Sequence, residues 1–165
     1  MEVFDMEINA LSKKFYVRKL DENDVELIYD LSCKNPIFYQ YHPPFVTRES
    51  IFEDMKALPQ GKSYDDKFYV GFFENKSLVA MMDLILDYPE KDIAFIGVFM
   101  TNIQYQHKGI SSEIICEIAM YLKSLGYKKI RLGVDKGNPQ SYSFWSKNHF
   151  NVINEDQYIL MELEI

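Results

Sequence analysis

A helix flanked by two apolar strands is the sequence feature that most limits the possible folds. Between residues 109 and 125 the apolar side chains recur with the spacing of one helix face: Ile110, Ile114, Ile115, Ile118, Ala119, Leu122 and Leu125. Gly126 follows, and glycine commonly ends a helix. The apolar run 93–100 precedes this segment and the alternating run 129–134 follows it. This order predicts a βαβ unit with parallel strands and a right-handed crossover.

The remaining segments predict strands and helices arranged around this unit. Strands are expected over 15–20, 68–75, 77–89 and 157–165, helices over 24–32, over 49–58 and from Pro139 onward, and a loop over 35–45. The turn between 68–75 and 77–89 is so short that these strands are expected to be antiparallel. The fold class is therefore α/β, or α+β in a stricter scheme, with a mixed, mostly antiparallel central sheet and flanking helices. Because the chain has no repeat or linker, one domain over residues 1–165 is expected.

Composition and charge disfavour several kinds of partner. The 165 residues are 47% hydrophobic and 26% charged, a composition typical of soluble globular proteins. The formal charge of −7 disfavours nucleic acids and anionic membranes as partners, because both bind basic surfaces. No apolar run is long enough for a membrane span, and the first residues do not resemble a leader. Cys33 and Cys116 are expected to be reduced core thiols of a cytoplasmic protein, and neither they nor the dispersed histidines have metal-ligand spacing.

The turn Gln-His-Lys-Gly-Ile-Ser, residues 106–111, has the composition of an anion site. The first N–H groups of a helix lack partners and carry partial positive charge, so a phosphate can bind there if the turn lets it approach. Gly109 has no Cβ to block that approach. Side chains that can donate hydrogen bonds stand beside it: His107, Lys108, Ser111 and Ser112. A plain helix start is the open alternative, since neither the P-loop nor the dinucleotide fingerprint is present.

Two motifs make the chain resemble the GNAT superfamily of acetyl-CoA-dependent N-acetyltransferases. The family's cofactor turn reads Gln or Arg, two residues, Gly, one residue, then Gly or Ala; residues 106–111 are similar, with Ser111 at the last position. The family's second motif is a strand, an Asn and a helix that ends in an aromatic residue, three residues, Gly or Asn, and Phe. The stretch GVDKGNPQSYSFWSKNHF, residues 133–150, is similar to it. The resemblance is good from about Phe68 onward and rests on element order before that.

The resemblance implies acetyl-CoA as cosubstrate and a set of residues that bind it. The backbone of Phe99, Met100 and Thr101 would bind the pantetheine arm at a bulge, where this strand splays from strand 129–134. The diphosphate would be held by the turn and the first helical residues, namely Gln106, His107, Lys108, Gly109, Ile110, Ser111 and Ser112. Asn138 would reach the pantetheine or the substrate, and Tyr142 and Trp145 would line the cofactor wall.

The chemistry of acetyl transfer to an amine requires a neutral amine, a polarised carbonyl and a leaving thiolate. A backbone N–H near Met100 or Thr101 can polarise the carbonyl. Many relatives protonate the sulfur with a Tyr where this chain has Trp145, and an indole does not release its proton at neutral pH. Tyr142 is the substitute candidate, with simple packing as the alternative. Asp83, within an apolar strand, is the candidate base or ammonium partner. The alternatives are a structural hydrogen-bonded role or a solvent-facing position for Asp83, with a water chain removing the proton from an amine that arrives partly neutral.

The acceptor implied by the resemblance is a primary amine of a small molecule or peptide. The loop 39–45, with Tyr64 and Phe68, is expected to line its pocket by analogy with the family. The acidic total charge suits cationic amines without selecting one. The closing strand 157–165 could pair with a second copy in a homodimer. A non-catalytic acyl-CoA-binding or regulatory module is the alternative function, because Trp145 replaces the usual acid.

Overall fold

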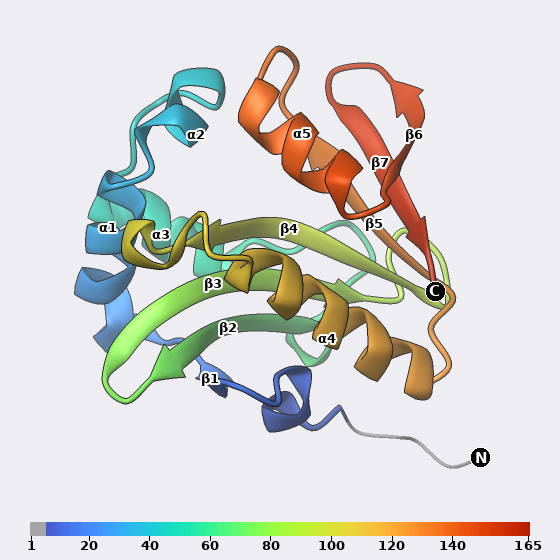
Figure 1. Ribbon diagram of the computed structural model, residues 1–165, viewed down its shortest axis with the longest axis horizontal. Coiled ribbons are helices and arrows are strands. Elements are labelled where there is room, and N and C mark those ends of the chain that lie inside the picture. The colour runs from blue at the N-terminus through green and yellow to red at the C-terminus, as the bar shows by residue number, and fades with distance from the viewer. Residues whose placement is uncertain (1–5) are drawn as a thin grey trace.

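A single seven-stranded sheet runs through the computed structural model, which describes residues 6–165 (Figure 1). Residues 1–5 lie outside the described residues. The prediction that the first residues do not form a leader falls partly on them. The strand order is β1-β2-β3-β4-β5-β7-β6. The strands are β1 (Tyr16–Lys19), β2 (Lys67–Glu74), β3 (Ser77–Leu86), β4 (Ile93–Thr101), β5 (Lys129–Val134), β6 (Asn151–Glu155) and β7 (Ile159–Glu164). β4 and β5 are parallel and every other neighbouring pair is antiparallel, which confirms the predicted fold class.

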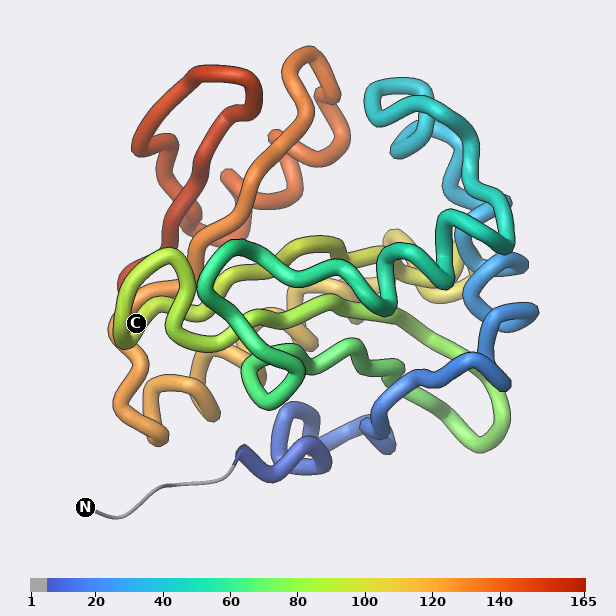
Figure 2. The backbone as a smooth tube through the Cα atoms, turned by 180° about the vertical axis from the view of Figure 1, so that it is seen from behind, coloured from blue at the N-terminus to red at the C-terminus, as the bar shows by residue number. Residues whose placement is uncertain are grey.

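Helices cover both faces of the sheet (Figures 1 and 2). The α-helices are α1 (Val25–Cys33), α2 (Pro36–Tyr41), α3 (Arg48–Lys56), α4 (Ile110–Ser124) and α5 (Pro139–Lys147). Single 3-10 turns are η1 (Ile8–Leu11), η2 (Glu22–Asp24), η3 (Tyr64–Asp66) and η4 (Ile103–Tyr105). α4 and α5 contribute to one apolar core, whereas α1 and α3 contribute to a second core on the opposite face.

Strand β3 is apolar on both faces because both faces are covered. Met82 and Leu84 belong to the core under α4, while Met81 belongs to the core under α1 and α3. Since side chains alternate along a strand, Asp83 lies on the same face as Met81. This places the one carboxylate of β3 beneath the helices α1 and α3.

Several sequence predictions differ from the structure. The segment 35–45 contains the helix α2, which begins at Pro36, a residue type suited to the first helical position. Strand β6 was not predicted, because its five residues are all exposed and show no apolar alternation. The expected strand 77–89 ends at Leu86. Strand β7 pairs with β5 and with β6, so the strand at this edge of the sheet is β6 rather than the closing strand. Cys116 is exposed on α4 rather than in the core.

The parallel strands β4 and β5 separate halfway along β4. They pair from Ile93 opposite Lys129 to Ile96 opposite Leu132, and no further. On its other side β4 keeps pairing with β3 as far as Thr101, with a bulge that skips Gly97. The bulge predicted near residues 99–101 therefore lies at Gly97. Beyond it, one edge of β4 faces a gap instead of a neighbouring strand.

Helix α4 can be tested as the main support of its face of the sheet. Ile118 is fully buried, so Ile118→Ala should lower the free energy of unfolding by about 2–4 kcal/mol through lost contacts and an unfilled cavity. Met120, on the same helix, is 60% exposed, and Met120→Ala should change it by no more than about 0.5 kcal/mol. Urea denaturation of both variants gives the comparison. Similar effects of the two substitutions would contradict the assigned packing of α4.

Candidate active site

The gap between β4 and β5 holds a cavity of about 360 Å³, lined by the end of β4, the start of α4 and helix α5. Most residues predicted to bind acetyl-CoA are brought together there: Phe99, Met100, Thr101, Gln106, His107, Gly109, Ser111, Ser112, Asn138 and Trp145. Lys108, Ile110 and Tyr142 are not among the lining residues. We call this space the cofactor cavity.

The end of β4 directs alternate backbone groups toward the cofactor cavity. The N–H of Asn102 donates to the carbonyl of Val79 on β3 at 2.7 Å, so residue 102 faces β3. The carbonyl of Thr101 instead accepts from the side-chain amide of Gln106 at 2.8 Å, on the other side of the strand. By alternation, Phe99 shares the direction of Thr101 and Met100 that of Asn102. The backbone N–H groups that face the gap are thus those of Phe99 and Thr101. The backbone N–H of Met100 points toward β3 instead.

The turn before α4 adopts the backbone shape that an anion site requires. Gly109 has φ +77°, and a Cβ placed there would meet no protein atom within 4 Å. His107 also has positive φ, at 61°, which is a strained conformation for a residue with a side chain. Gly109, Ser111 and Ser112 line the cavity, so the positive end of α4, with its unpaired N–H groups, lies at the cavity wall.

Ser111 and Gln106 connect this turn to its surroundings. The hydroxyl groups of Ser111 and Thr101 are hydrogen-bonded at 2.8 Å, so the serine that stands where the family has Gly or Ala ties α4 to β4. The Gln106 amide donates to the carbonyl of Thr101 and to Oδ1 of Asn35, both at 2.8 Å. Asn35 lines the cavity but was not predicted, because nothing in the sequence around it signals a contact 71 residues away.

The wall formed by α5 is aromatic and closely packed. Trp145 is 7% exposed and lies 4.9–6.0 Å, centroid to centroid, from Phe99, Phe144 and Phe150. Tyr142, by contrast, is 44% exposed and lies outside the lining. Its position gives no support to a role in protonating the sulfur. Asn138 is 3% exposed, and its Oδ1 accepts from the N–H of Ser141 and so caps α5.

A second cavity of about 490 Å³ lies on the other side of β4, under α1 to α3. Phe38 and Met100 line both cavities, so the two spaces meet at these residues. Part of the segment 39–45 lines the second cavity as predicted, but Tyr64 and Phe68 do not. Tyr64 is 58% exposed, and Phe68 packs against the core on the opposite face because neighbouring strand residues alternate. We call this space the acceptor cavity.

Asp83 lies at the floor of the acceptor cavity and is paired. Its Oδ2 accepts from the ammonium group of Lys67 at 3.0 Å. Burial raises the pKa of the Asp83 carboxyl, while Lys67 opposes that rise. A Cβ on Gly97 would stand only 3.1 Å from Oδ2. The glycine at the bulge therefore leaves the approach to this oxygen uncovered.

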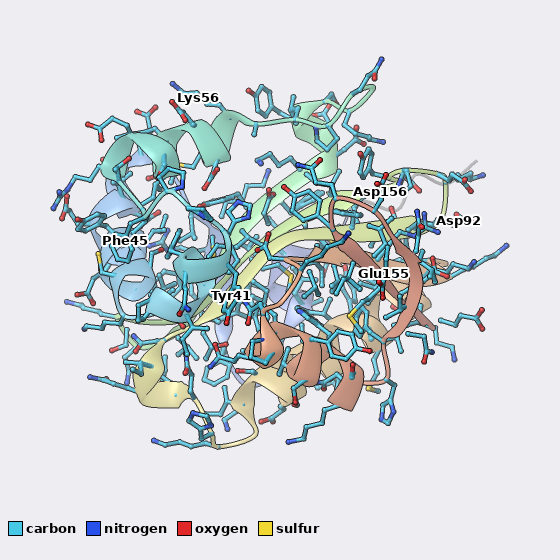
Figure 3. The ribbon with its side chains drawn as sticks, turned by 90° about the horizontal axis from the view of Figure 1, so that it is seen from above. Tyr41, Phe45, Lys56, Asp92, Glu155 and Asp156 are labelled. Atoms are coloured by element: carbon cyan, nitrogen blue, oxygen red, sulfur yellow. The ribbon has the colours of Figure 1, made fainter. Side chains whose placement is uncertain are left out.

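Helix α2 reaches across the gap toward the loop that follows β5. His42 Nδ1 lies 3.0 Å from Oδ1 of Asp135, and the Tyr41 ring would be 3.7 Å from a Cβ on Gly137. Figure 3 shows Tyr41 near the middle of the molecule, between α1 and α3 on one side and α5 on the other. Through these contacts the end of α2 is joined to the loop after β5, next to the place where the two cavities meet.

The two cavities differ in charge. Among the described residues that line the cofactor cavity there is no carboxylate, whereas His107 and Lys147 are present. The acceptor cavity is lined by four carboxylates: Glu53, Asp54, Asp83 and Asp135. Within residues 6–165, no three His, Cys, Asp or Glu side chains are grouped as metal ligands. No helix in the same part of the chain is long and apolar enough to cross a membrane.

Comparison with known proteins agrees with this geometry. Residues 26–150 match the acetyltransferase (GNAT) family. A spermidine N(1)-acetyltransferase of Thermoplasma acidophilum is 22% identical over 148 residues, which cover 85% of this chain and 90% of that protein. The fold matches the PaiA N-acetyltransferase of the same organism, crystallised with coenzyme A, with a TM-score of 0.70, 21% identity and coverage of 92% and 99%. An acetyltransferase of Thermus thermophilus gives a TM-score of 0.77 at 16% identity, with coverage of 90% and 96%.

The chain belongs to the GNAT acetyltransferase family. It is an N-acetyltransferase that takes its acetyl group from acetyl-CoA and transfers it to an amine.

The anion site at α4 makes a direct prediction about cofactor binding. Gly109→Asp should weaken acetyl-CoA binding by about 100-fold or more, because it places bulk and negative charge where the diphosphate would lie. Gly126→Asp is a matched control: Gly126 has φ +97°, equally open surroundings, and lies at the far end of the same helix. Calorimetric titration should find its affinity within about twofold of the parent protein. Equal losses in both variants would mean that backbone strain, and not the diphosphate, is responsible.

Proposed function

We propose that acetyl-CoA occupies the cofactor cavity and that a cationic amine enters through the acceptor cavity. One observation carries this proposal: two cavities of opposite charge character meet at Phe38 and Met100. A polyanionic cofactor suits the cavity without carboxylates, and an ammonium group suits the one with four. The reacting thioester and amine would then come together across β4, at the point where the cavities join.

The exposed edge of β4 would hold and polarise the thioester. The N–H groups of Phe99 and Thr101 face the gap and have no neighbouring strand there. The pantetheine amides would pair with this edge as an added strand would, and a free N–H would donate to the thioester carbonyl. The fold fixes this backbone N–H in place before the reaction begins. Little reorganisation is therefore needed as negative charge develops on the thioester oxygen.

Asp83 would act as the base. An ammonium group at the cavity floor would transfer a proton to Oδ2, which faces the opening over Gly97. The neutral nitrogen would then attack the carbonyl carbon and the C–S bond would break. The nitrogen would lose its second proton to water, which leaves the acetylated amine and the CoA thiolate as products. A carboxyl whose pKa burial has raised is a better proton acceptor than an ordinary one. We propose this role for Asp83 in preference to that of a purely structural carboxylate.

The thiolate would leave without help from a tyrosine. Trp145 stands where relatives have a tyrosine, and Tyr142 lies outside the lining. A thiol has a pKa of about 8.5, so its anion is a fair leaving group at neutral pH. Water at the open mouth of the cavity can protonate it after departure.

Tyr142→Phe tests the absence of a tyrosine acid. We expect kcat to change by less than about twofold across pH 6–9, because the hydroxyl group does not reach the cofactor cavity. General acid catalysis is typically worth about 10²–10⁴-fold. A fall of that size in steady-state kcat, with the melting temperature unchanged, would restore Tyr142 as the acid.

The acceptor would carry a second positive charge in addition to the reacting amine. Once Asp83 receives the reacting ammonium, Asp54 and Glu53 remain along the cavity without an ion-pair partner among the described residues. The aromatic side chains of Phe38, Tyr39 and Tyr69 add faces that favour a cation. The relative named as a spermidine acetyltransferase supports such an acceptor. A polyamine or a basic peptide amine fits this description, in a cytoplasmic protein that could pair through the β6 edge as a homodimer.

A matched series of amines tests this proposal. 1,4-Diaminobutane, 1-aminobutane and 4-aminobutanoate present the same amine on chains that end in a positive, a neutral and a negative group. We expect kcat/KM for CoA release to fall by about tenfold or more at each step, the size of one hydrogen bond to a charged group. Equal rates for the three would exclude charge selection. Cofactor binding without CoA release for any amine would instead support a non-catalytic acyl-CoA-binding module.

A further inference from the structure

The ammonium group of Lys67 is buried beneath the acceptor cavity and has all three of its hydrogens engaged. Lys67 is 4% exposed, although lysine is rarely buried without a specific partner. Its Nζ donates to the carbonyl groups of Asp54 and Ala57 at 2.9 Å each, and to Oδ2 of Asp83 at 3.0 Å. Asp54 lies in the last turn of α3 and Ala57 is its C-cap, a region where helix carbonyls lack internal partners.

Lys67 therefore joins two parts of the acceptor cavity that no other described ion pair connects. One end of the contact is the carboxylate at the floor, on β3, and the other is the C-terminus of the helix above it. Because an ammonium group has only three donors, Lys67 has none left for a substrate. It does not line the acceptor cavity either. Any effect it has on the reaction must pass through Asp83 or through α3.

Asp83 depends on this partner more than an exposed carboxylate would. Its side chain is 16% exposed, and its Oδ1 is buried without a hydrogen-bond donor among the described residues. A buried carboxylate without a counter-charge tends to take up a proton, and a protonated Asp83 could not accept one from the substrate. Lys67 supplies the counter-charge and fixes Oδ2 on the side of the opening above Gly97.

We propose that Lys67 is a positioning residue that keeps Asp83 ionised and aimed at the acceptor amine. This inference rests on the proposed function, in which Asp83 takes the proton of the substrate ammonium. Lys67 touches neither the substrate nor the cofactor. Its contribution is to hold the base in the state and the direction that proton transfer requires.

Other charged and titratable groups around Asp83 also affect its pKa. Tyr69 lies opposite Asp83 on β2, and burial raises the pKa of its hydroxyl group well above the usual value, so it stays neutral. Asp54 of α3 raises the pKa of Asp83 by repulsion. The other ionisable groups lining the cavity are Tyr39, His42, Glu53, Asp135 and Tyr158. Lys67 is the cation in direct contact with Asp83, so its removal should raise the pKa of Asp83 further.

The expected pH dependence of kcat follows from this rise in the pKa of Asp83. Asp83 must be ionised to act, so activity falls as the pH drops through its pKa in the enzyme–substrate complex. In Lys67→Met the pKa rises, and the acidic limb of kcat should move to higher pH by about one unit. In Lys67→Arg, which keeps the charge, the limb should stay near its original position. A lysine that only supported α3 would lower kcat without moving the limb.

A double-mutant cycle between Lys67 and Asp83 separates the two roles. We expect Asp83→Asn to lower kcat by about 100-fold or more, the usual worth of a general base. Lys67→Met should lower kcat by about tenfold at pH 7 in the parent enzyme, and by less than about twofold in the Asp83→Asn background. Lys62→Met is a matched control. Lys62 is also largely buried, with 15% of its side chain exposed, but it bonds to Asp66 and the Asp87 carbonyl, away from the cavity.

Each outcome of the double-mutant cycle either supports or overturns the positioning role proposed for Lys67. Equal losses from Lys67→Met in both backgrounds would overturn the proposal and leave Lys67 as a support for α3. Near-normal kcat in Asp83→Asn would overturn it too, since there would be no base to position. If Lys67→Met fails to fold, by circular dichroism, Lys67→Arg and Asp83→Asn still decide: a shifted acidic limb in the arginine variant would contradict the proposal. A parent enzyme that releases no CoA with any amine would refute the proposed function instead.

Discussion

The separation of β4 from β5 beyond Ile96 is the constraint on which the rest of the site depends. A continuous parallel pair would satisfy the backbone of β4 on both sides and leave nothing for a ligand. Because the pairing stops, one edge of β4 is free within the interior of the protein, where unpaired N–H groups are costly. The skipped Gly97 lets β4 bend at this point while it keeps its partner β3. The gap thus provides a cofactor cavity and backbone donors from one irregularity.

The same irregularity divides the charges of the site. The face of the sheet under α4 and α5 presents a helix N-terminus, hydroxyls and amides, which suit the cofactor in the proposed arrangement. The face under α1 to α3 presents carboxylates and aromatic rings, which suit the proposed cationic acceptor. β4 is the partition between them, so its edge can present a thioester to a nucleophile that arrives from the other face. The contact between His42 and Asp135, both of which line the acceptor cavity, links the end of α2 to the end of β5.

How much of this could be read from the sequence depended on whether the signal was local. The helix 109–125 and its strands were predictable because periodicity is a local property, and the turn at Gly109 was predictable from helix electrostatics. Asn35 and Lys67 were not, because their roles arise from contacts 71 and 16 residues away in the chain. Lys67 at the start of a strand looks like a surface lysine until the fold buries it. Whether Tyr142 lines the cavity could not be read from the sequence for a related reason: three residues along a helix is close to one turn, but near the end of a cavity that angle decides whether a side chain lines it.

The Lys67–Asp83 pair illustrates what a buried charge can contribute. Removing two charges from water is expensive, and the attraction between them often repays that free energy only in part, so a buried ion pair is weak evidence for stability. Apolar residues of similar size would suit the core around β3 as well, since its neighbours are methionines, leucines and isoleucines. A charged pair within an otherwise apolar core that brings no gain in stability points to a functional reason. The proposed role of Asp83 as the base supplies that reason: Lys67 favours the ionised form of a carboxylate that an apolar core would otherwise protonate, and this carboxylate lies next to the one glycine in β4.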